Sequence, residues 1–175
     1  DLYVDLICKD EADLTRCVRN ITESSKNISD YFLINPYFAE MYPIKFADKK
    51  HDKPFVLVNE EIKSIILSDK EKQILKILAG DSRISLVDLY KKSGVSPEMS
   101  FHIIKKLQKL GVIQGTKLMF NMALLGYSYT AILFNVTGHS DQLQREIKDF
   151  CNKHPLVNSL GLSVNKPNCF IQVFH

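Results

Sequence analysis

The chain has 175 residues, of which 45% are hydrophobic and 25% charged, and its formal net charge is +3. This is the composition of a globular protein with one or two domains. It holds no apolar run of the ~20 residues that a membrane-spanning helix needs. Its acidic, alternating first residues do not fit a signal peptide. We therefore expect a globular protein without a membrane segment.

The N-terminal part is predicted to be a β-α-β segment. Residues 2–8 and 28–38 are rich in strand formers, and residues 10–25 place apolar side chains at helical spacing. Because the chain opens without Met inside the first of these strands, we expect it to be a piece of a longer protein. Residues 39–66 contain two prolines and a run of charged residues. We interpret them as a linker, and residues 55–58 could form a short strand there.

Residues 67–125 are predicted to form a separate, mainly helical domain. Each of its three helices starts at a serine that can cap the helix N-terminus. These predicted caps are Ser68, Ser85 and Ser96. Pro97 fits the first position of the third helix, which is predicted to run to about Leu110. Residues 112–120 are predicted to add one or two short strands.

The second and third helices are joined by the turn Ser93-Gly94-Val95-Ser96. Gly94 can adopt the left-handed conformation that this turn needs, and Val95 can fill the angle between the helices. Two short helices joined in this way predict a helix-turn-helix, whose second helix enters the major groove of DNA. At 100° per residue, the third helix has an apolar side centred near Leu107 and a basic side opposite to it.

Positive charge is concentrated in this domain. Residues 1–67 carry 9 Lys and Arg against 12 Asp and Glu, whereas residues 68–120 carry 10 against 5 and residues 121–175 carry 4 against 3. A local basic excess is what a polyanionic partner requires. A solvated, lysine-rich helical surface is the simpler explanation of the same pattern.

We expect eight residues of this domain to contact double-stranded DNA. They are Ser96, Glu98, Phe101, His102, Lys105, Lys106 and Lys109 of the third helix, and Lys117 after it. Lysines suit phosphates and guanine edges, and a serine at a helix start suits a phosphate. His102 could donate to a base, Phe101 could touch a thymine methyl, and Glu98 could accept from cytosine. Three-helix units also serve as protein-interaction modules, so an assembly module without DNA binding is the alternative.

The C-terminal part, residues 126–175, is predicted to be a β-α-β-β segment. Its strands are expected at 127–137, 156–164 and 168–174, around a helix at 140–153. Together with residues 1–38 it supplies the parts of one βαββαβ unit, cut in its middle and written in reverse order. Chance is the alternative explanation of so short a match.

The cysteines of the chain do not indicate a metal site. Cys8, Cys17, Cys151 and Cys169 form no C-x-x-C pair and have no histidine at ligand spacing. We expect them to be small buried side chains of a protein in a reducing, cytoplasmic compartment. No catalytic set, metal cluster or phosphate loop is identifiable, so we expect no cofactor and no enzymatic activity.

Residues 67–136 resemble the Lrp/AsnC family of feast/famine regulators. The resemblance rests on LSDKEKQIL, DSRIS, GVSP, KKLQKLGVIQG and LGY, in this order and at the family's spacing. It implies an α+β fold in which a winged helix-turn-helix is joined to ferredoxin-like βαββαβ domains of the RAM type. Residues 1–38 would be the second half of one such domain and residues 126–175 the first half of another. It also implies homodimers or higher oligomers, in which each DNA half-site is read by one third helix.

Some positions depart from the family's pattern. His102 and Ile103 stand where the family usually has arginine, which would weaken contacts with DNA. The turn NKPNCF lacks the family's glycine and acidic residue near the effector site, so an amino-acid-like effector is not identifiable. A sister group decarboxylates sirohaem-type tetrapyrroles and is the enzymatic alternative. Its expected His, Arg or Tyr is missing from PLVNSLGLSVNKPN, which argues against it.

Overall fold

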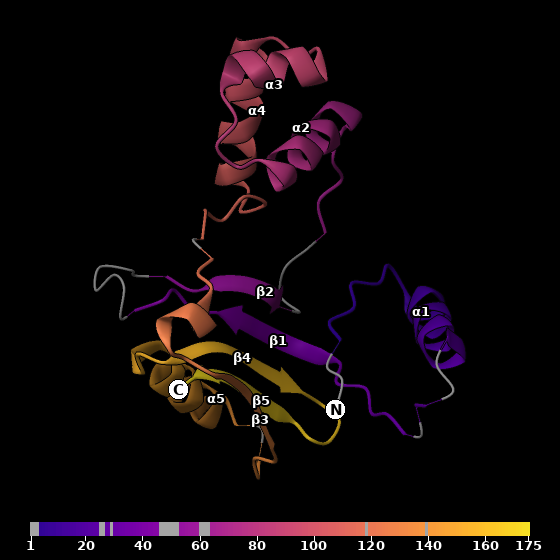
Figure 1. The fold of residues 1–175 in the computed structure, drawn as a ribbon, viewed down its shortest axis with the longest axis vertical. Helices are drawn as coiled ribbons and strands as arrows, with labels where there is room; N and C mark the ends of the chain where they lie inside the picture. The colour runs from indigo at the N-terminus through magenta and orange to yellow at the C-terminus, as the bar shows by residue number, and fades with distance from the viewer. Residues whose placement is uncertain are drawn as a thin grey trace. The chain divides into compact units, whose positions relative to one another are not determined.

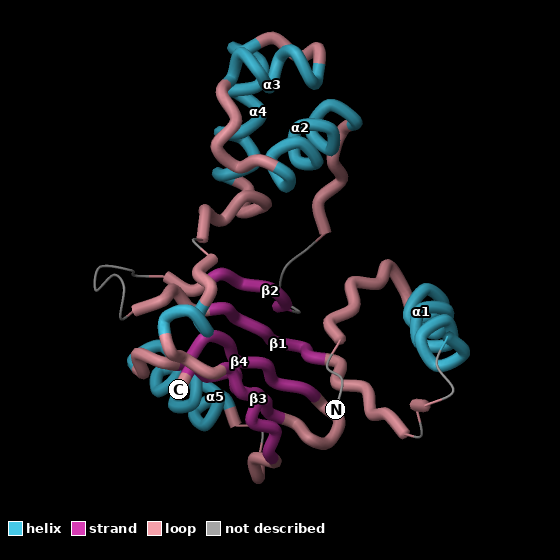
Figure 2. The backbone as a smooth tube through the Cα atoms, in the orientation of Figure 1, coloured by secondary structure: helices cyan, strands magenta, loops and turns pink. Residues whose placement is uncertain are grey.

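The helices and strands fall into two units of the chain, residues 1–33 and 34–175 (Figures 1 and 2). They are seen in a computed structural model that describes residues 4–24, 27–28, 30–45, 53–59, 64–117, 119–138 and 140–175.

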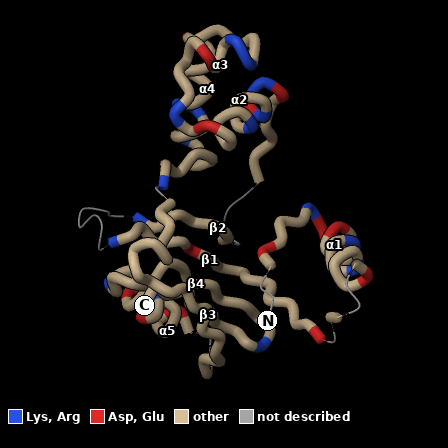
Figure 3. Tube along the Cα trace, in the orientation of Figure 1, with Lys and Arg blue, Asp and Glu red and all other residues tan. Residues whose placement is uncertain are grey.

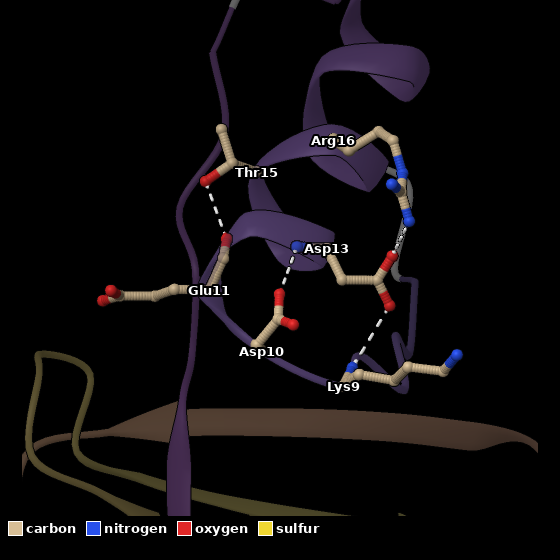
Figure 4. A network of polar contacts seen from close by, with 6 residues as sticks. All are labelled: Lys9, Asp10, Glu11, Asp13, Thr15 and Arg16. Carbon is tan, nitrogen blue, oxygen red and sulfur yellow. Dashed lines mark hydrogen bonds and ion pairs between the residues drawn. The ribbon is translucent and has the colours of Figure 1, made fainter.

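The first unit contains the helix α1, Glu11–Ser24, which confirms the predicted helix at 10–25. Figure 4 shows how the helix begins: Asp10 Oδ1 accepts a hydrogen bond from the Asp13 amide at 2.8 Å. Asp13 Oδ2 accepts one from the Lys9 amide at 3.2 Å, and the Asp13 carboxylate also pairs with Arg16. These bonds supply acceptors for amides that have no partner at a helix start.

The strand predicted over residues 2–8 is wrong for the residues described, since 4–8 are not in a strand. The strand predicted over 28–38 is largely wrong too, because only its last residues, from Pro36, are in a strand. Alternation of apolar side chains gives a segment a face to bury. Alternation does not supply the neighbouring strand with which the backbone groups of the segment must form hydrogen bonds. Among the described residues, no strand pairs with residues 4–8.

The described residues of the second unit form one antiparallel sheet with the order β2-β1-β4-β5-β3. The strands are β1 (Pro36–Met41), β2 (Phe55–Asn59), β3 (Tyr129–Phe134), β4 (Val157–Ser163) and β5 (Cys169–Phe174). β2 confirms the short strand considered at 55–58. The three strands predicted in the C-terminal part are confirmed by β3, β4 and β5.

The helix α5, Asp141–Lys153, lies on one face of this sheet and confirms the helix predicted at 140–153 (Figure 2). Cys151 of α5 is fully buried in a core with residues of three strands, β1, β4 and β5, and of the segment after β1. The buried members of this core are Phe38, Tyr42, Cys151, Val157, Leu160, Leu162, Cys169 and Ile171. β4 is buried along its whole length, and strands pair with both of its edges.

The order of β3, β5 and β4 is that of the first three strands in a ferredoxin-like unit. A complete βαββαβ unit would place its fourth strand beside β3. The strand β1 instead pairs with β4, at the other side, so β3 is an edge of the sheet among the described strands. Residues 36–38 therefore extend the C-terminal sheet in this structure but do not close it.

The helical domain consists of α2 (Asp69–Gly80), α3 (Leu86–Ser93) and α4 (Pro97–Lys109), followed by a short 3-10 helix, η1 (Met122–Leu125). The three predicted caps are confirmed: Ser68, Ser85 and Ser96 each accept a hydrogen bond from the amide three residues on. Ser68 and Glu71 form a capping box, in which each side chain accepts a hydrogen bond from the backbone amide of the other.

The strands predicted over residues 112–120 are wrong, since the described residues of this range contain none. The side chain of Gln114 takes the place of a partner strand. Its Oε1 accepts a hydrogen bond from the Val56 amide at 2.7 Å, and its Nε2 donates to the Val56 carbonyl at 2.6 Å. One amide side chain thus satisfies both backbone groups of a residue in β2.

Cys151 and Cys169 are buried as predicted, whereas Cys8 and Cys17 are half-exposed, so the prediction of burial fails for these two. In the described ranges, no three His, Cys, Asp or Glu side chains come together in a way that could hold a metal ion. The same ranges contain no helix with the length and hydropathy to cross a membrane.

Candidate nucleic-acid interface

The turn between α3 and α4 has the geometry of a helix-turn-helix. Gly94 adopts the left-handed conformation with φ of +68°, and its amide donates to the Tyr90 carbonyl at 2.8 Å. The Ser93 hydroxyl donates to the Leu89 carbonyl at 2.7 Å and accepts from the Val95 amide at 3.1 Å. Val95 is buried with 6% exposure, so it fills the angle between the two helices as predicted.

One side of α4 anchors the helix in the domain. Ser100, Ile103 and Leu107 are buried, and the two apolar side chains pack with Ile74 of α2 and Leu89 of α3. Ser100 is small enough for close packing, and its hydroxyl donates to the Val95 carbonyl at 3.2 Å. This confirms the apolar side that the sequence placed around Leu107.

The opposite side of α4 is exposed and carries Glu98, His102, Lys105 and Lys109. All seven expected residues of this helix are exposed: Ser96, Glu98, Phe101, His102, Lys105, Lys106 and Lys109. Figure 3 shows Lys and Arg spread over α2, α3 and α4, with acidic residues among them. Within the described chain, no acidic side chain forms an ion pair with Lys105 or Lys109.

The ammonium of Lys105 lies 5.6 Å from the centroid of the Phe101 ring, one helical turn away. Phe101 is 48% exposed, and its ring meets the ring of His102 edge-on, with 6.1 Å between centroids. A cation held over an aromatic face remains available to an anion on its other side. The exposed side of α4 therefore combines a lysine, an apolar ring and an imidazole within one turn.

Lys106 points elsewhere, although it is next to Lys105 in sequence. Its Nζ lies 2.7 Å from Oε1 of Glu71, whose side chain is 6% exposed at the N-terminus of α2. Glu71 Oε2 also accepts from the Ser68 amide at 2.8 Å and the Ser68 hydroxyl at 2.9 Å. The hydrogen bond from Lys106, followed by those from Ser68, lowers the pKa of Glu71 to about 2.

The contact of Lys106 with Glu71 was not predicted, because the two residues are 35 positions apart in the sequence. A shallow hollow lies at the junction of α2 and α4. It is lined by Ser68, Lys70, Glu71, Met99, His102, Ile103 and Lys106. Spacing along one helix cannot reveal such a junction, since it depends on how two helices pack.

Lys117, which follows α4, was expected to contact DNA. In the structure its Nζ donates to Oδ1 of Asn158 at 2.9 Å, and burial lowers the pKa of Lys117. A contact between Lys117 and a phosphate would require it to leave Asn158.

The comparisons with known proteins centre on this domain. A family model described as winged helix-turn-helix DNA-binding matches residues 67–114. An HTH-type transcriptional regulator of Pyrococcus furiosus is 40% identical over 67 residues, which are 38% of this chain and 45% of that protein. A leucine-responsive regulatory protein of Rhizobium meliloti is 32% identical over 105 residues, 58% of this chain and 66% of that protein. A second Pyrococcus furiosus regulator is 31% identical over 103 residues, covering 58% of this chain and 67% of that protein.

The chain belongs to the Lrp/AsnC family of transcriptional regulators. A crystal structure of an AsnC family transcriptional regulator from Agrobacterium tumefaciens has the same fold over 62% of this chain and 71% of that chain. The TM-score is 0.55 and the sequence identity 21%. This Lrp/AsnC chain spans 45–46% of the length of the first two curated relatives that it matches.

Proposed function

We propose that this Lrp/AsnC chain binds double-stranded DNA and regulates transcription, with α4 as the helix that enters the major groove. The observation that carries the proposal is the division of α4 into two sides. One side is buried against α2 and α3, and the other exposes Lys105, Lys109 and His102. A helix anchored in this way can approach phosphates and base edges without unfolding the domain.

The proposed contacts follow from the chemistry of each side chain. Lys105 and Lys109 would meet phosphates or guanine edges, and His102 would donate to a base acceptor. Phe101, held beside Lys105, would touch a thymine methyl, and Glu98 would accept from cytosine N4. Ser96 caps α4 by accepting from the Met99 amide at 3.3 Å, so its hydroxyl hydrogen remains for a phosphate.

The test is binding of a pool of random-sequence duplexes at several salt concentrations, followed by sequencing of the bound fraction. Wild-type affinity should fall steeply with salt, because lysine contacts release counterions from DNA. The double variant Lys105→Glu/Lys109→Glu should lose binding and keep its fold. The matched control is Arg145→Glu/Lys153→Glu, the same charge change at exposed positions of α5. Equal loss in both variants would mean that only net charge matters, and the assignment to α4 would be wrong.

We also propose that the chain acts as a homodimer, through the face of the sheet opposite to α5. Cross-strand pairing places Tyr129 beside Phe174 and Leu133 beside Phe170 on that face. Tyr129 is 51% and Leu133 38% exposed, so the face has apolar surface to bury. Sedimentation of the wild type and of Leu133→Glu tests this proposal: the wild type should be a dimer and the variant a monomer. A monomeric wild type at micromolar concentration would contradict it.

A further inference from the structure

We propose that Lys106 is a positioning residue, which fixes α4 against the N-terminus of α2 through Glu71 and makes no contact with DNA phosphate. The proposal rests on the proposed function, since it concerns the helix that would enter the groove. It assigns different roles to Lys106 and its sequence neighbour Lys105, although both are positively charged, exposed residues of α4.

The direction of the Lys106 side chain separates it from Lys105. Lys106 lies about 100° around α4 from Lys105. It shares this flank of the helix with Met99 and Ile103, which line the hollow beside the N-terminus of α2. Its Nζ lies 2.7 Å from Oε1 of Glu71. The ammonium is thus turned toward α2, away from the exposed side that carries Lys105 and Lys109.

Glu71 supplies an anion at the start of α2. A helix N-terminus has unpaired amides and a partial positive charge, and it attracts an anion. Here that anion is the carboxylate of Glu71, which accepts from the Ser68 amide at 2.8 Å. Because the Ser68 and Glu71 amides already donate to side chains of the domain itself, these two amides are not available to a DNA phosphate.

Breaking the ion pair between Lys106 and Glu71 would cost free energy. Glu71 is 5% exposed, so withdrawal of Lys106 would leave a buried carboxylate without its cation. A charge-assisted hydrogen bond to this carboxylate holds the ammonium, although 61% of the Lys106 side chain is exposed, whereas a lysine–phosphate contact at an exposed site is modest in energy and shared with water. Lys106 therefore stays on Glu71 when DNA binds, and the pair keeps the angle between α2 and α4 constant.

The experiment compares Lys106→Met with Lys105→Met. Both variants remove one positive charge from adjacent, exposed positions of α4, and methionine keeps the apolar stem. For each, the dissociation constant for a 30-base-pair duplex would be measured against salt concentration. Lys105→Met should reduce the slope of log affinity against log salt by about 0.9, the value for one phosphate contact. Lys106→Met should weaken binding at each salt concentration and leave the slope at the wild-type value.

A second measurement does not depend on DNA. Hydrogen exchange of the Ser68 amide reports whether the Glu71 carboxylate is held in place. Exchange of the Ser68 amide should be about tenfold faster in Lys106→Met, because this variant loses the charge-assisted hydrogen bond to Glu71. The exchange rate should stay at the wild-type value in Lys105→Met and return to it in Lys106→Arg, since both variants keep a cation at position 106.

The two proposals fail in different ways. A slope lowered by about 0.9 in Lys106→Met, or unchanged Ser68 exchange, would overturn the positioning role. Absence of duplex binding by the wild type would overturn the proposed function, while the exchange experiment would still decide whether Lys106 holds α2 and α4 together. If Lys106→Met did not fold, Lys106→Gln would replace it, with Lys105→Gln as the control.

Discussion

Phe170 lies over Gly161, its cross-strand partner in the β4–β5 pair. A Cβ atom at position 161 would lie 2.0 Å from both Cε1 and Cζ of the Phe170 ring, closer than atoms can approach. The absence of a side chain at Gly161 thus gives the ring a place on the sheet. This is the face opposite to α5, on which we propose that two chains meet.

Gly161→Ala should lower the free energy of unfolding by about 1–3 kcal/mol, because the ring must leave its place or the strands must separate. Chemical denaturation followed by circular dichroism measures this change. Gly80→Ala is the matched control, since nothing lies within 4 Å of its Cβ position. We expect the control to be neutral or stabilised by up to about 1 kcal/mol. Equal destabilisation in both variants would contradict the role of the ring.

Lys45→Met should loosen the C-terminal end of α5. The Lys45 ammonium donates to the Cys151 carbonyl at 2.7 Å and the His154 carbonyl at 3.0 Å, and it lies 4.8 Å from the centroid of the Tyr42 ring. Helix ends leave such carbonyls without partners. Loss of these bonds should cost about 1–3 kcal/mol of unfolding free energy.

The control for Lys45 is Lys153→Met, which removes an exposed ion pair with Asp149 on the same helix. Its expected cost is below about 0.5 kcal/mol. A larger effect in the control than in Lys45→Met would show that the carbonyl contacts of Lys45 do not hold the helix end.

The stability of the helical domain should decrease in acid because of Glu71. Its pKa is about 2 in the folded chain, against about 4.3 for an unfolded glutamate. A lowered pKa means that the ionised form is favoured by folding, so the contribution is full above about pH 4.3 and is lost as the pH falls toward 2. The melting temperature, followed by circular dichroism between pH 6 and pH 2, should show this loss.

Glu71→Gln should make that acid dependence shallower, because the amide does not titrate. Glu98→Gln, at an exposed position of α4, should leave the dependence as in the wild type. If the melting temperature of Glu71→Gln instead followed that of the wild type at every pH, the hydrogen bonds to Glu71 would not be the source of the loss of stability in acid.

The parts that could be predicted from the sequence are those decided within a few residues. A capping serine accepts from an amide only three residues away, and the predicted caps Ser68, Ser85 and Ser96 are confirmed. The turn after α3 is also local, and Gly94 adopts the left-handed conformation predicted there. The buried side of α4 follows from spacing along one helix in the same way.

Features that depend on distant partners could not be read in advance. The strand expected over residues 2–8 has the right alternation but no strand beside its described part. The described residues of 112–120 contain none of the expected strands, and the side chain of Gln114 there pairs with Val56, 58 positions away. The direction of Lys106 was hidden for the same reason, since it is set by Glu71 on another helix. Tertiary packing decides such cases.

The four cysteines should separate into two reactive classes. Burial raises the pKa of Cys151 to about 12 and that of Cys169 to about 11, and both side chains are enclosed in the sheet core. Cys8 and Cys17 are half-exposed. Because the thiolate is the reactive form and the reagent needs access, a maleimide at pH 7.5 should label only Cys8 and Cys17 in the native chain.

Mass spectrometry of peptides after short labelling would count the modified thiols, and labelling in denaturant should modify all four. Desolvation, followed by a hydrogen bond with Cys17, raises the pKa of Cys8, so its labelling should accelerate as the pH is raised from 7 to 9. Cys151 and Cys169 should stay protected over that range, because their thiols remain protonated and enclosed. Native labelling of Cys151 as fast as that of Cys17 would mean that α5 does not stay packed on the sheet, and the core described for the second unit would be wrong.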